Sequence, residues 1–179
     1  MTIQRLTPWF AGQYREVMLE AYARHPEAFT SSASERAALP LTWWEARLEE
    51  TPRPGEVIFG ALESQALVGV VGLAFENREK ARHKATLIGM YVRKRSQGHG
   101  LGGQLVTAAL AYLATQPDIK LVQLTVTDGN TAAQALYERF GFAPFGIEPM
   151  AIAVAGGYVS KVHMWRRLDI PLTGVPRKA

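Results

Sequence analysis

The sequence predicts one α/β domain of the α+β type, with a mixed, mostly antiparallel central sheet flanked by helices. Segments with the hydrophobic alternation of strands follow one another in the middle of the chain, closely enough to be joined as hairpins. Segments with apolar residues at helical spacing stand before and after them. The length of 179 residues and a hydrophobic content of 47% suit a single domain with its own core. We therefore expect one domain over residues 1–170, followed by a tail over residues 171–179.

The amino-terminal part of the chain predicts one strand and two helices. A strand is predicted over residues 2–6 and a helix over residues 8–25. A loop or short turns follow over residues 26–40, and a second helix is predicted over residues 43–50. Thr7 is expected at the N-cap of the first helix, because Pro8 after it is preset for a first helical turn. Pro26 stops that helix, and Thr42 is expected to cap the second one.

Strands and helices alternate through the rest of the chain. Six further strands are predicted, over residues 57–59, 67–73, 84–93, 119–127, 151–154 and 158–166. Two further helices are predicted, from residue 101 to about 117 and from 131 to 140. Gly141 is expected at the C′ position of the last helix, because glycine readily adopts the left-handed conformation that ends many helices.

The composition excludes several classes of protein. The chain has no cysteine, so it has no disulfide framework, thiol nucleophile or thiolate metal site. No apolar run approaches 18 residues, and Arg5 interrupts the only apolar stretch at the amino terminus, so neither a membrane span nor a signal peptide is expected. The histidines show no metal-ligand spacing, and no Ser-His-Asp set is readable. A cytoplasmic protein with no metal and no membrane partner is expected.

Positive charge is concentrated in one segment of the chain. The net charge is +4, and residues 76–99 alone contain seven basic and two acidic residues. Such a segment is either a solvated hairpin with basic ends or a surface for an anionic partner. Nucleic-acid binding favours aromatic residues among the basic ones, and Tyr91 is the only aromatic residue there. We therefore rank a small anionic ligand above nucleic acid.

A glycine-rich segment joins a predicted strand to a predicted helix. Residues 98–103 read Gly-His-Gly-Leu-Gly-Gly, which places four glycines in six residues. Glycine within a helix costs about 0.5–1 kcal/mol relative to alanine. Gly102 and Gly103 lie in the first helical turn, so a compensating role is expected for them. An anion held by backbone N–H groups at the helix N-terminus would supply that role. A plain glycine-rich turn is the alternative.

Two nucleotide-binding patterns do not fit this segment. A P-loop needs lysine after its last glycine, whereas Gln104 follows Gly103. The dinucleotide pattern Gly-x-Gly-x-x-Gly is formally present, but five polar or charged residues separate Val92 from Gly98, and such a turn follows its strand directly. Asp118 falls near the place of an acidic ribose ligand, yet it precedes the next predicted strand instead of ending it.

A third pattern, Gln/Arg-x-x-Gly-x-Gly/Ala, fits residues 97–102 completely. A second block, Asn-x-x-Ala-x-x-Leu-Tyr-Glu-x-x-Gly-Phe over residues 130–142, follows after one predicted strand. With these two blocks in this order, the chain resembles the GNAT superfamily of acyl-CoA-dependent N-acetyltransferases over roughly residues 56–166. Residues 90–92 are similar to the strand that leads into the family's pyrophosphate loop.

The resemblance implies acetyl-CoA as co-substrate. Backbone N–H groups of the loop would hold the pyrophosphate of coenzyme A, and the strand before the loop would pair with its pantetheine arm. The backbone N–H of Met90 would polarise the thioester carbonyl. Arg93, Lys94 and Arg95 either meet the 3′-phosphate or are ordinary surface charges. Asn130 is a helix cap, a partner of the pantetheine arm, or both. The expected cofactor-binding residues are Met90, Tyr91, Val92, Gln97, Gly98, His99, Gly100, Leu101, Gly102, Gly103 and Asn130.

The reaction that the resemblance implies is direct attack of a neutral primary amine, on a small molecule or a peptide, on the acetyl thioester. Tyr137 matches the family's proton donor to the departing thiolate, and its alternative role is packing on the apolar face of its helix. Several family members carry Glu four residues before the position that Met90 fills. Thr86 stands there in this chain and cannot accept a proton at neutral pH, so we name no general base.

The acceptor site is expected between the first two helices and the last hairpin. Residues 25–32 resemble a stretch that borders the acceptor cleft in a subgroup of small bacterial family members, and Phe29 and Ser32 are the residues expected to meet the substrate there. Loop packing is their alternative role. Two other functions stay open: acetylation of a protein N-terminus, and an inactive acyl-CoA-binding module, which the absence of a base at Thr86 favours. A homodimer is also left open.

Overall fold

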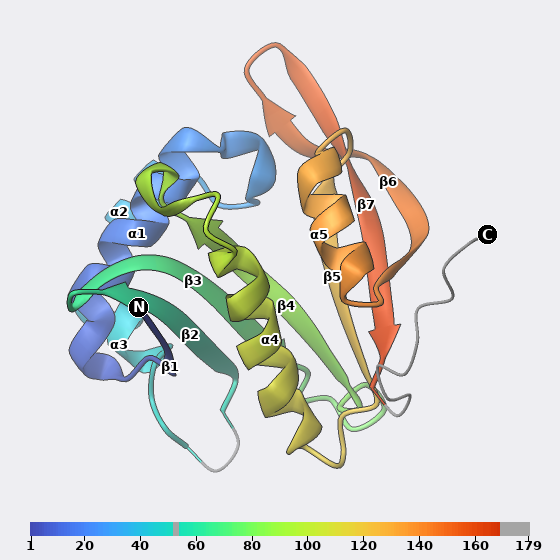
Figure 1. Cartoon of the computed structure of the whole chain (residues 1–179). Coiled ribbons are helices and arrows are strands. Elements are labelled where there is room, and N and C mark those ends of the chain that lie inside the picture. Colours follow the sequence, from blue (N-terminus) through green and yellow to red (C-terminus); the bar gives the residue numbers. More distant parts are fainter. Residues whose placement is uncertain (52–53, 169–179) are drawn as a thin grey trace.

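A seven-stranded mixed sheet forms the centre of the chain in the computed structural model, which describes residues 1–51 and 54–168 (Figure 1). The strands are β1 (Thr2–Arg5), β2 (Glu56–Glu63), β3 (Ala66–Phe75), β4 (Lys84–Val92), β5 (Leu121–Thr127), β6 (Ala143–Val154) and β7 (Gly157–Arg167). Their order across the sheet is β1-β2-β3-β4-β5-β7-β6, and only the β4–β5 pair is parallel. The predicted fold class, a mostly antiparallel sheet flanked by helices, is confirmed.

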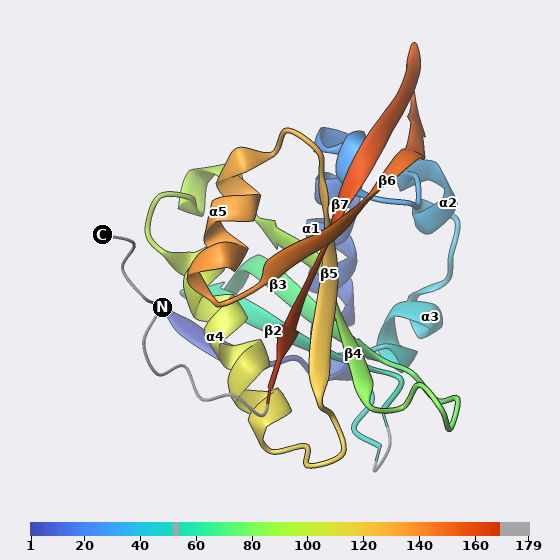
Figure 2. The same cartoon turned by 90° about the vertical axis from the view of Figure 1, so that its right-hand side faces the viewer.

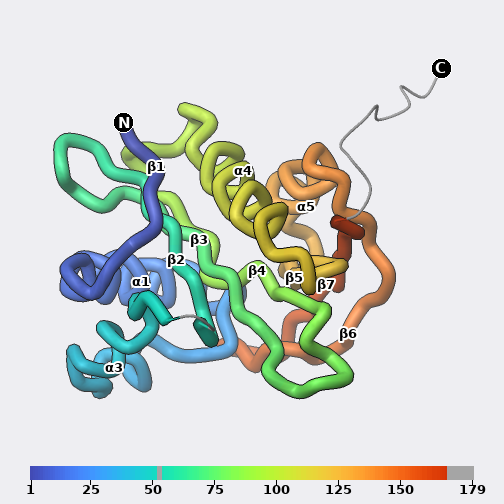
Figure 3. Tube along the Cα trace, turned by 90° about the horizontal axis from the view of Figure 1, so that it is seen from below, coloured from blue at the N-terminus to red at the C-terminus, as the bar shows by residue number. Residues whose placement is uncertain are grey.

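Helices cover both faces of this sheet. They are α1 (Ala11–Arg24), α2 (Ala33–Ala37), α3 (Leu41–Ala46), α4 (Leu101–Ala114) and α5 (Thr131–Arg139), with short 3-10 turns η1 (Pro8–Phe10), η2 (Pro26–Ala28) and η3 (Lys94–Ser96). Viewed from below, α4 and α5 lie on one face of the sheet, and α1 and α3 lie on the other (Figure 3). Among the described residues, no helix combines the length and the apolar character that crossing a bilayer would require.

Two apolar clusters hold the helices to the sheet. On one face, Leu105, Ala109 and Leu113 recur at helical spacing along α4 and are buried against β2, β3 and β4. On the other face, Val17 of α1 and Trp44 of α3 are fully buried in a second cluster. Strand β3 lies between the two clusters, so both of its faces are buried and it consists of a nearly continuous apolar run.

The sheet splits between its two central strands. β4 and β5 pair only over residues 84–86 and 121–123, at one end of each strand. A bulge follows in β4: Val70 pairs with Tyr91 and Gly72 with Ile88, which leaves Gly89 and Met90 opposite Val71 alone. Gly89 has a φ of +60°, which glycine adopts without strain. The split opens a cleft beside β4, and the bulge sets the direction of Met90 within it.

The predicted helix starts near the amino terminus were right at Thr7 and wrong at Thr42. Thr7 is the N-cap and Pro8 the first residue of the 3-10 turn η1, which runs directly into α1, but the Thr7 side chain makes no capping hydrogen bond. Thr42 does not cap the next helix, because α3 already begins at Leu41 with Pro40 as its N-cap and ends at Ala46. The fixed φ of proline suits it to the position just before a helical turn.

Two further segments contain more regular structure than predicted. Within residues 26–40, α2 forms behind a complete capping box, in which Ser32 and Glu35 bond each other's backbone N–H groups. β6 begins at Ala143, eight residues before the predicted strand. The prolines in the first part of this strand argued against a strand there, but β6 is an edge strand, where proline is tolerated.

The hairpin of β6 and β7 extends beyond the rest of the molecule (Figure 2). The expected tail over residues 171–179 lies outside the described residues.

Candidate functional site

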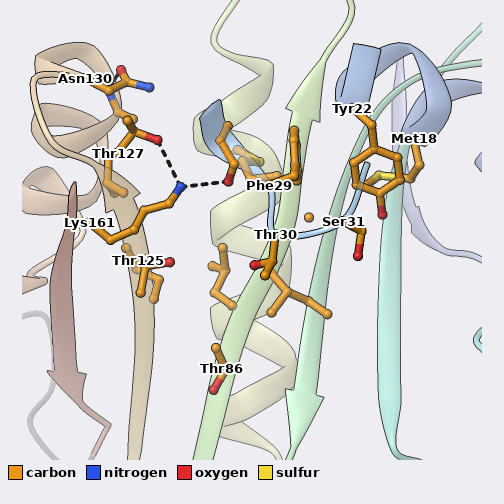
Figure 4. Close-up of a pocket in the computed structure, with 18 of the residues that line it drawn as sticks. Met18, Tyr22, Phe29, Thr30, Ser31, Thr86, Thr125, Thr127, Asn130 and Lys161 are labelled. Carbon is orange, nitrogen blue, oxygen red and sulfur yellow. Dashed lines mark hydrogen bonds between the residues drawn. The ribbon is translucent and has the colours of Figure 1, made fainter. Parts of the chain in front are cut away.

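Two adjoining cavities occupy the cleft beside β4. The inner cavity, of about 370 Å³, lies between β4, β5, α1 and η2 (Figure 4). The outer cavity, of about 480 Å³, lies between the glycine loop before α4 and the first turns of α5. The residues that line both are Ala28, Phe29, Met90, Asn130 and Ala133. A ligand could therefore enter from the glycine loop and reach the inner cavity past Met90.

The glycine loop leaves an open helix N-terminus at the outer cavity. Gly98 and Gly100 have φ values of +81° and +73°, and no atom lies within 4 Å of the place where a Cβ would be at either position. Gly100 is the N-cap of α4 and supplies no capping side chain, so the N–H groups of the first turn have no partner within the helix. Such a cradle suits a phosphate group, which gains from both the N–H groups and the helix dipole.

Side chains around the glycine loop divide into three roles. The Gln97 Nε2 donates to the Val92 carbonyl oxygen at 2.8 Å and closes the loop on the end of β4. The Arg93 Nε lies 3.0 Å from Glu20 Oε2 in an ion pair with α1, so Arg93 is engaged in holding the fold. Lys94 and Arg95 are exposed beside the loop. His99 is also exposed and does not line the outer cavity, although the other predicted loop residues from Gln97 to Gly103 do.

The end of β4 lies along the path between the two cavities. Met90 lines both cavities, and Tyr91 and Val92 line the outer one. The Tyr91 side chain turns to the opposite face, where it is buried under α1 and its hydroxyl donates to Glu20 Oε1 at 2.9 Å. Only the backbone of Tyr91 is thus available to a ligand in the cleft.

Helix α5 supplies Asn130 and Tyr137. The Asn130 Oδ1 accepts a hydrogen bond of 3.1 Å from the Ala133 N–H, so Asn130 caps α5 while it also lines both cavities. Tyr137 lines the inner cavity and is 6% exposed, with its ring edge-on to Phe142 at 5.7 Å between centroids. Burial raises the pKa of Tyr137, so the phenol stays protonated at neutral pH.

The two residues predicted to meet the acceptor are placed differently. Phe29 lines both cavities and packs edge-on against Tyr22 at 5.0 Å between ring centroids. Ser32 does not line the inner cavity, because its hydroxyl caps α2 by accepting from the Glu35 N–H at 3.1 Å. Ser31 lines the cavity instead. The role of Ser32 in the fold is therefore to start α2.

The floor of the inner cavity carries Thr86. Its hydroxyl accepts a hydrogen bond from Gln123 Nε2 at 3.3 Å, across the parallel β4–β5 pair. Thr86 stands where the resemblance implies Glu in several family members, and it lines the cavity, but it brings no group that can take a proton near neutral pH.

The sequence does not indicate Lys161 as a site residue, although it is one of the most buried polar residues. It is 5% exposed, and its Nζ donates to the Ala28 and Glu27 carbonyl oxygens at 2.8 and 3.2 Å and to Thr127 Oγ1 at 2.9 Å (Figure 4). Thr127 Oγ1 itself donates to the Glu27 carbonyl oxygen at 2.9 Å. Strands β5 and β7 are thus tied to η2 across the cleft.

Arg36, Arg47 and Glu56 also line the inner cavity and were not selected from the sequence. They come from α2, the end of α3 and the start of β2. Arg47 Nη2 lies 2.6 Å from Glu56 Oε2. Burial raises the pKa of Glu56, and the Arg47 charge partly offsets this effect. No spacing in the sequence joins these three residues, because only the packing of α2 and α3 over β2 brings them together.

The fold and the site together define a class: an α/β domain with a sheet split at a parallel pair, where an open helix N-terminus faces a cleft that leads to a second cavity. The sequence model described as "Acetyltransferase (GNAT) family" matches residues 14–142, and the chain belongs to this family. The resemblance found in the two sequence blocks is thereby confirmed.

Similar proteins agree with this assignment. Over 125 residues, or 69% of this chain, the sequence is 31% identical to a mycothiol acetyltransferase of Salinispora tropica, and the match spans 38% of that relative's length. A GNAT-family acetyltransferase of Streptococcus pneumoniae has the same fold, with a TM-score of 0.81, 23% identity and coverage of 93% and 98% of the two chains. The yncA structure of Salmonella typhimurium, solved with its cofactor acetyl-CoA, has a TM-score of 0.78, 20% identity and coverage of 100% and 99%.

Proposed function

We propose that this protein is an N-acetyltransferase that moves an acetyl group from acetyl-CoA to a primary amine by direct attack. One observation carries the proposal: the open N-terminus of α4 adjoins a cleft that leads past the Met90 bulge to the buried phenol of Tyr137. Family membership and the acetyl-CoA in the Salmonella structure support the same reading.

The outer cavity fits the phosphate end of coenzyme A. The N–H groups around Gly98 and Gly100 would hold the pyrophosphate, since neither residue places a side chain in its way. Lys94 and Arg95 are the exposed cations for the 3′-phosphate, whereas Arg93 is engaged with Glu20. When bound, acetyl-CoA supplies the activated acetyl thioester. Asn130 lines the path between the cavities and is available to the pantetheine arm while it caps α5.

The inner cavity brings together the groups for acyl transfer. Met90 has no paired residue in β3 because of the bulge, and within the described chain β5 pairs with β4 only as far as Thr86. The backbone N–H of Met90 is therefore the proposed donor to the thioester carbonyl oxygen. Tyr137 would give its proton to the departing thiolate, and its raised pKa keeps that proton in place until then. With Thr86 at the floor, the amine enters in its neutral form or loses its proton to water.

Binding of acetyl-CoA is the first test of this function. Calorimetric titration should show binding of acetyl-CoA, with NADH as a negative control. Gly100→Glu should weaken binding at least about tenfold, because it places a negative charge in the anion cradle. Gly156→Glu is the matched control, since Gly156 also has a positive φ, of +88°, is exposed and has an open Cβ position. Unchanged acetyl-CoA affinity in Gly100→Glu would contradict the loop assignment.

Transfer is then measured as release of the coenzyme A thiol in the presence of amines. Acetylation of small amines would support the proposal, and acetylation of peptides alone would favour a protein N-terminal acetyltransferase. An acyl-CoA-binding module without catalysis is the second candidate, because Thr86 supplies no base. Tight acetyl-CoA binding without transfer to any amine or peptide would favour that module over an enzyme.

A further inference from the structure

The end of the inner cavity away from Lys161 carries two guanidinium groups. Arg36 of α2 and Arg47 after α3 both lie on the ring of Trp43, with their Cζ atoms 4.6 and 4.7 Å from its centroid. Both line the cavity together with the hydroxyl-bearing rings of Tyr14 and Tyr22. An arginine that stacks on an aromatic ring has a fixed plane, so its N–H donors are held in a constant direction.

Hydrogen-bond donors exceed acceptors at this end of the cavity. Among the described residues, Glu56 is the one carboxylate that lines the cavity; it is paired with Arg47, and the charge of Arg36 also acts on it. No ion pair among residues 1–51 and 54–168 includes Arg36. The Nε atoms of Arg36 and Arg47 and the Oε2 of Glu56 are all buried without a hydrogen-bond partner of good geometry, so the one carboxylate does not satisfy both guanidinium groups. The Nη groups of Arg36, which lines the cavity, are the donors that a ligand carboxylate would meet.

The cavity as a whole is positively charged. Within the described chain, its charged lining residues are Arg36, Arg47 and Lys161 against the single carboxylate of Glu56. Lys161 donates to carbonyl and hydroxyl oxygens, and the carboxylates of Glu27 and Glu148, which act on its charge, are not part of the cavity lining. A polyamine would add further cations to this lining, whereas an anionic group would complement it.

We propose that the acceptor is an amine that also carries a carboxylate, of the kind found in an amino acid, and that Arg36 binds the carboxylate. This inference rests on the proposed acetyl transfer. The planar guanidinium of Arg36 can donate two parallel hydrogen bonds to a carboxylate. The apolar side chains of Met18, Phe29 and Ile88 line the cavity where the carbon skeleton would lie. The amine would then lie toward Met90 and Tyr137.

The test uses pairs of acceptors that differ only in the carboxylate. The standard amino acids, each beside its amide, and spermidine are supplied with acetyl-CoA, and thiol release is followed. For the best amino acid, kcat/KM should exceed that of its amide by about 10- to 100-fold, the range for one charge-assisted pair. Spermidine should be a poorer acceptor than that amino acid.

Variants of Arg36 assign the effect to one residue. Arg36→Gln should raise KM for the amino acid about 10- to 100-fold and remove its advantage over the amide. Acetyl-CoA affinity should not change, because Arg36 does not line the outer cavity. Arg36→Lys should keep part of the preference, since it retains the charge but not the planar fork. Arg78→Gln is the matched control, because the Arg78 side chain is 82% exposed on the β3–β4 connection.

The outcomes separate this inference from the proposed function. Equal or better transfer to amides or to spermidine would overturn the carboxylate assignment and leave acetyl transfer standing. An unchanged preference in a folded Arg36→Gln, with an unaltered melting temperature, would overturn the role of Arg36. Tight acetyl-CoA binding with no transfer to any amine would overturn both.

Discussion

Tyr137 shows how one side chain can belong to the core and to the site at once. Its ring packs against Phe142 and is buried, while it lines the inner cavity from α5. Within the described residues, its hydroxyl has no hydrogen-bond partner, and burial is the cause of its raised pKa. A hydroxyl without a protein partner adds nothing to the packing of the ring, so packing alone gives no reason for tyrosine over phenylalanine here.

Tyr137→Phe should therefore lower kcat about 100-fold, within the range for loss of a general acid, while acetyl-CoA binding is unchanged. The fold should persist, because the ring is retained. Tyr158→Phe is the matched control, since Tyr158 is 61% exposed on β7. Steady-state kinetics and calorimetry measure the two effects. Wild-type turnover in Tyr137→Phe would return the residue to a packing role.

The pH profile gives an independent check of the same residue. As pH rises, kcat/KM should increase until the amine is neutral, at about pH 8 for a peptide N-terminus. For a free amino acid the increase should continue to higher pH, because its ionised carboxylate stabilises the ammonium form. Tyr137 acts in its protonated form, so the rate should fall only above the phenol pKa, and burial moves that fall above the usual value of about 10. A decline that begins below pH 9 would contradict Tyr137 as the donor.

At the scale of elements, η2 bridges the cleft where the two cavities adjoin. Ala28 of η2 and Phe29 just after it line both cavities, and the carbonyl groups of η2 are held by Lys161 and Thr127 from the other side of the split. Short connecting segments of this kind have little packing of their own. The position of η2, and hence the shape of the acceptor cavity, depends on these hydrogen bonds.

Lys161→Met should loosen η2 without unfolding the sheet. Two carbonyl groups lose a charged donor, so amide hydrogen exchange over residues 25–31 should accelerate about tenfold or more, from the worth of hydrogen bonds to a charged group. Lys120→Met serves as the control, because Lys120 is exposed and donates to a loop carbonyl, that of Pro117. Equal exchange over residues 25–31 in the wild type and Lys161→Met would show that Thr127 holds η2 alone.

Local signals explain which elements could be predicted from the sequence. The glycine loop, the α5 block and Gly141 at C′ carry their conformation in their own residues, since positive φ and open backbone require glycine. The capping box of α2 was also encoded, as Ser32 and Glu35, but so short a helix has no apolar periodicity to draw attention to it. The start of β6 was hidden because its edge position, which tolerates proline, is a property of the whole sheet.

The charged end of the inner cavity could not be predicted in the same way. Arg36, Arg47 and Glu56 meet only because α2 and α3 pack over the start of β2, and each is an unremarkable surface-type residue in its own segment. One feature of the sequence indicates that Lys161 is buried: it is a lysine at an inward position of a predicted strand. This indication is weak, because the burial of that position depends on η2 from the far end of the chain.

For the whole molecule, the split sheet divides the fold into two parts that share one apolar core on the side of α4 and α5. β1–β4 form one part with α1 to α4, and β5–β7 form the other with α5. The described contacts between them include the short β4–β5 ladder at one end of the cleft and the Lys161 and Thr127 bonds to η2 at the other. The outer cavity is lined from both parts, by the glycine loop and by α5.

A ligand that fills the cleft should therefore stabilise the molecule as a whole. At a concentration 100 times its Kd, acetyl-CoA should add about 2.7 kcal/mol to the free energy of unfolding. For a domain of this size, that raises Tm by about 5–10 °C. Gly100→Glu should melt without this shift, whereas the control Gly156→Glu, at another glycine with positive φ, should keep it. Thermal unfolding followed by circular dichroism, with and without acetyl-CoA, measures the difference.

Because the ligand would contact both parts, amide exchange should slow in α5 as well as in the glycine loop. Protection confined to the loop would mean that acetyl-CoA is held by the α4 end alone, and the path past Met90 to Tyr137 would lose its support.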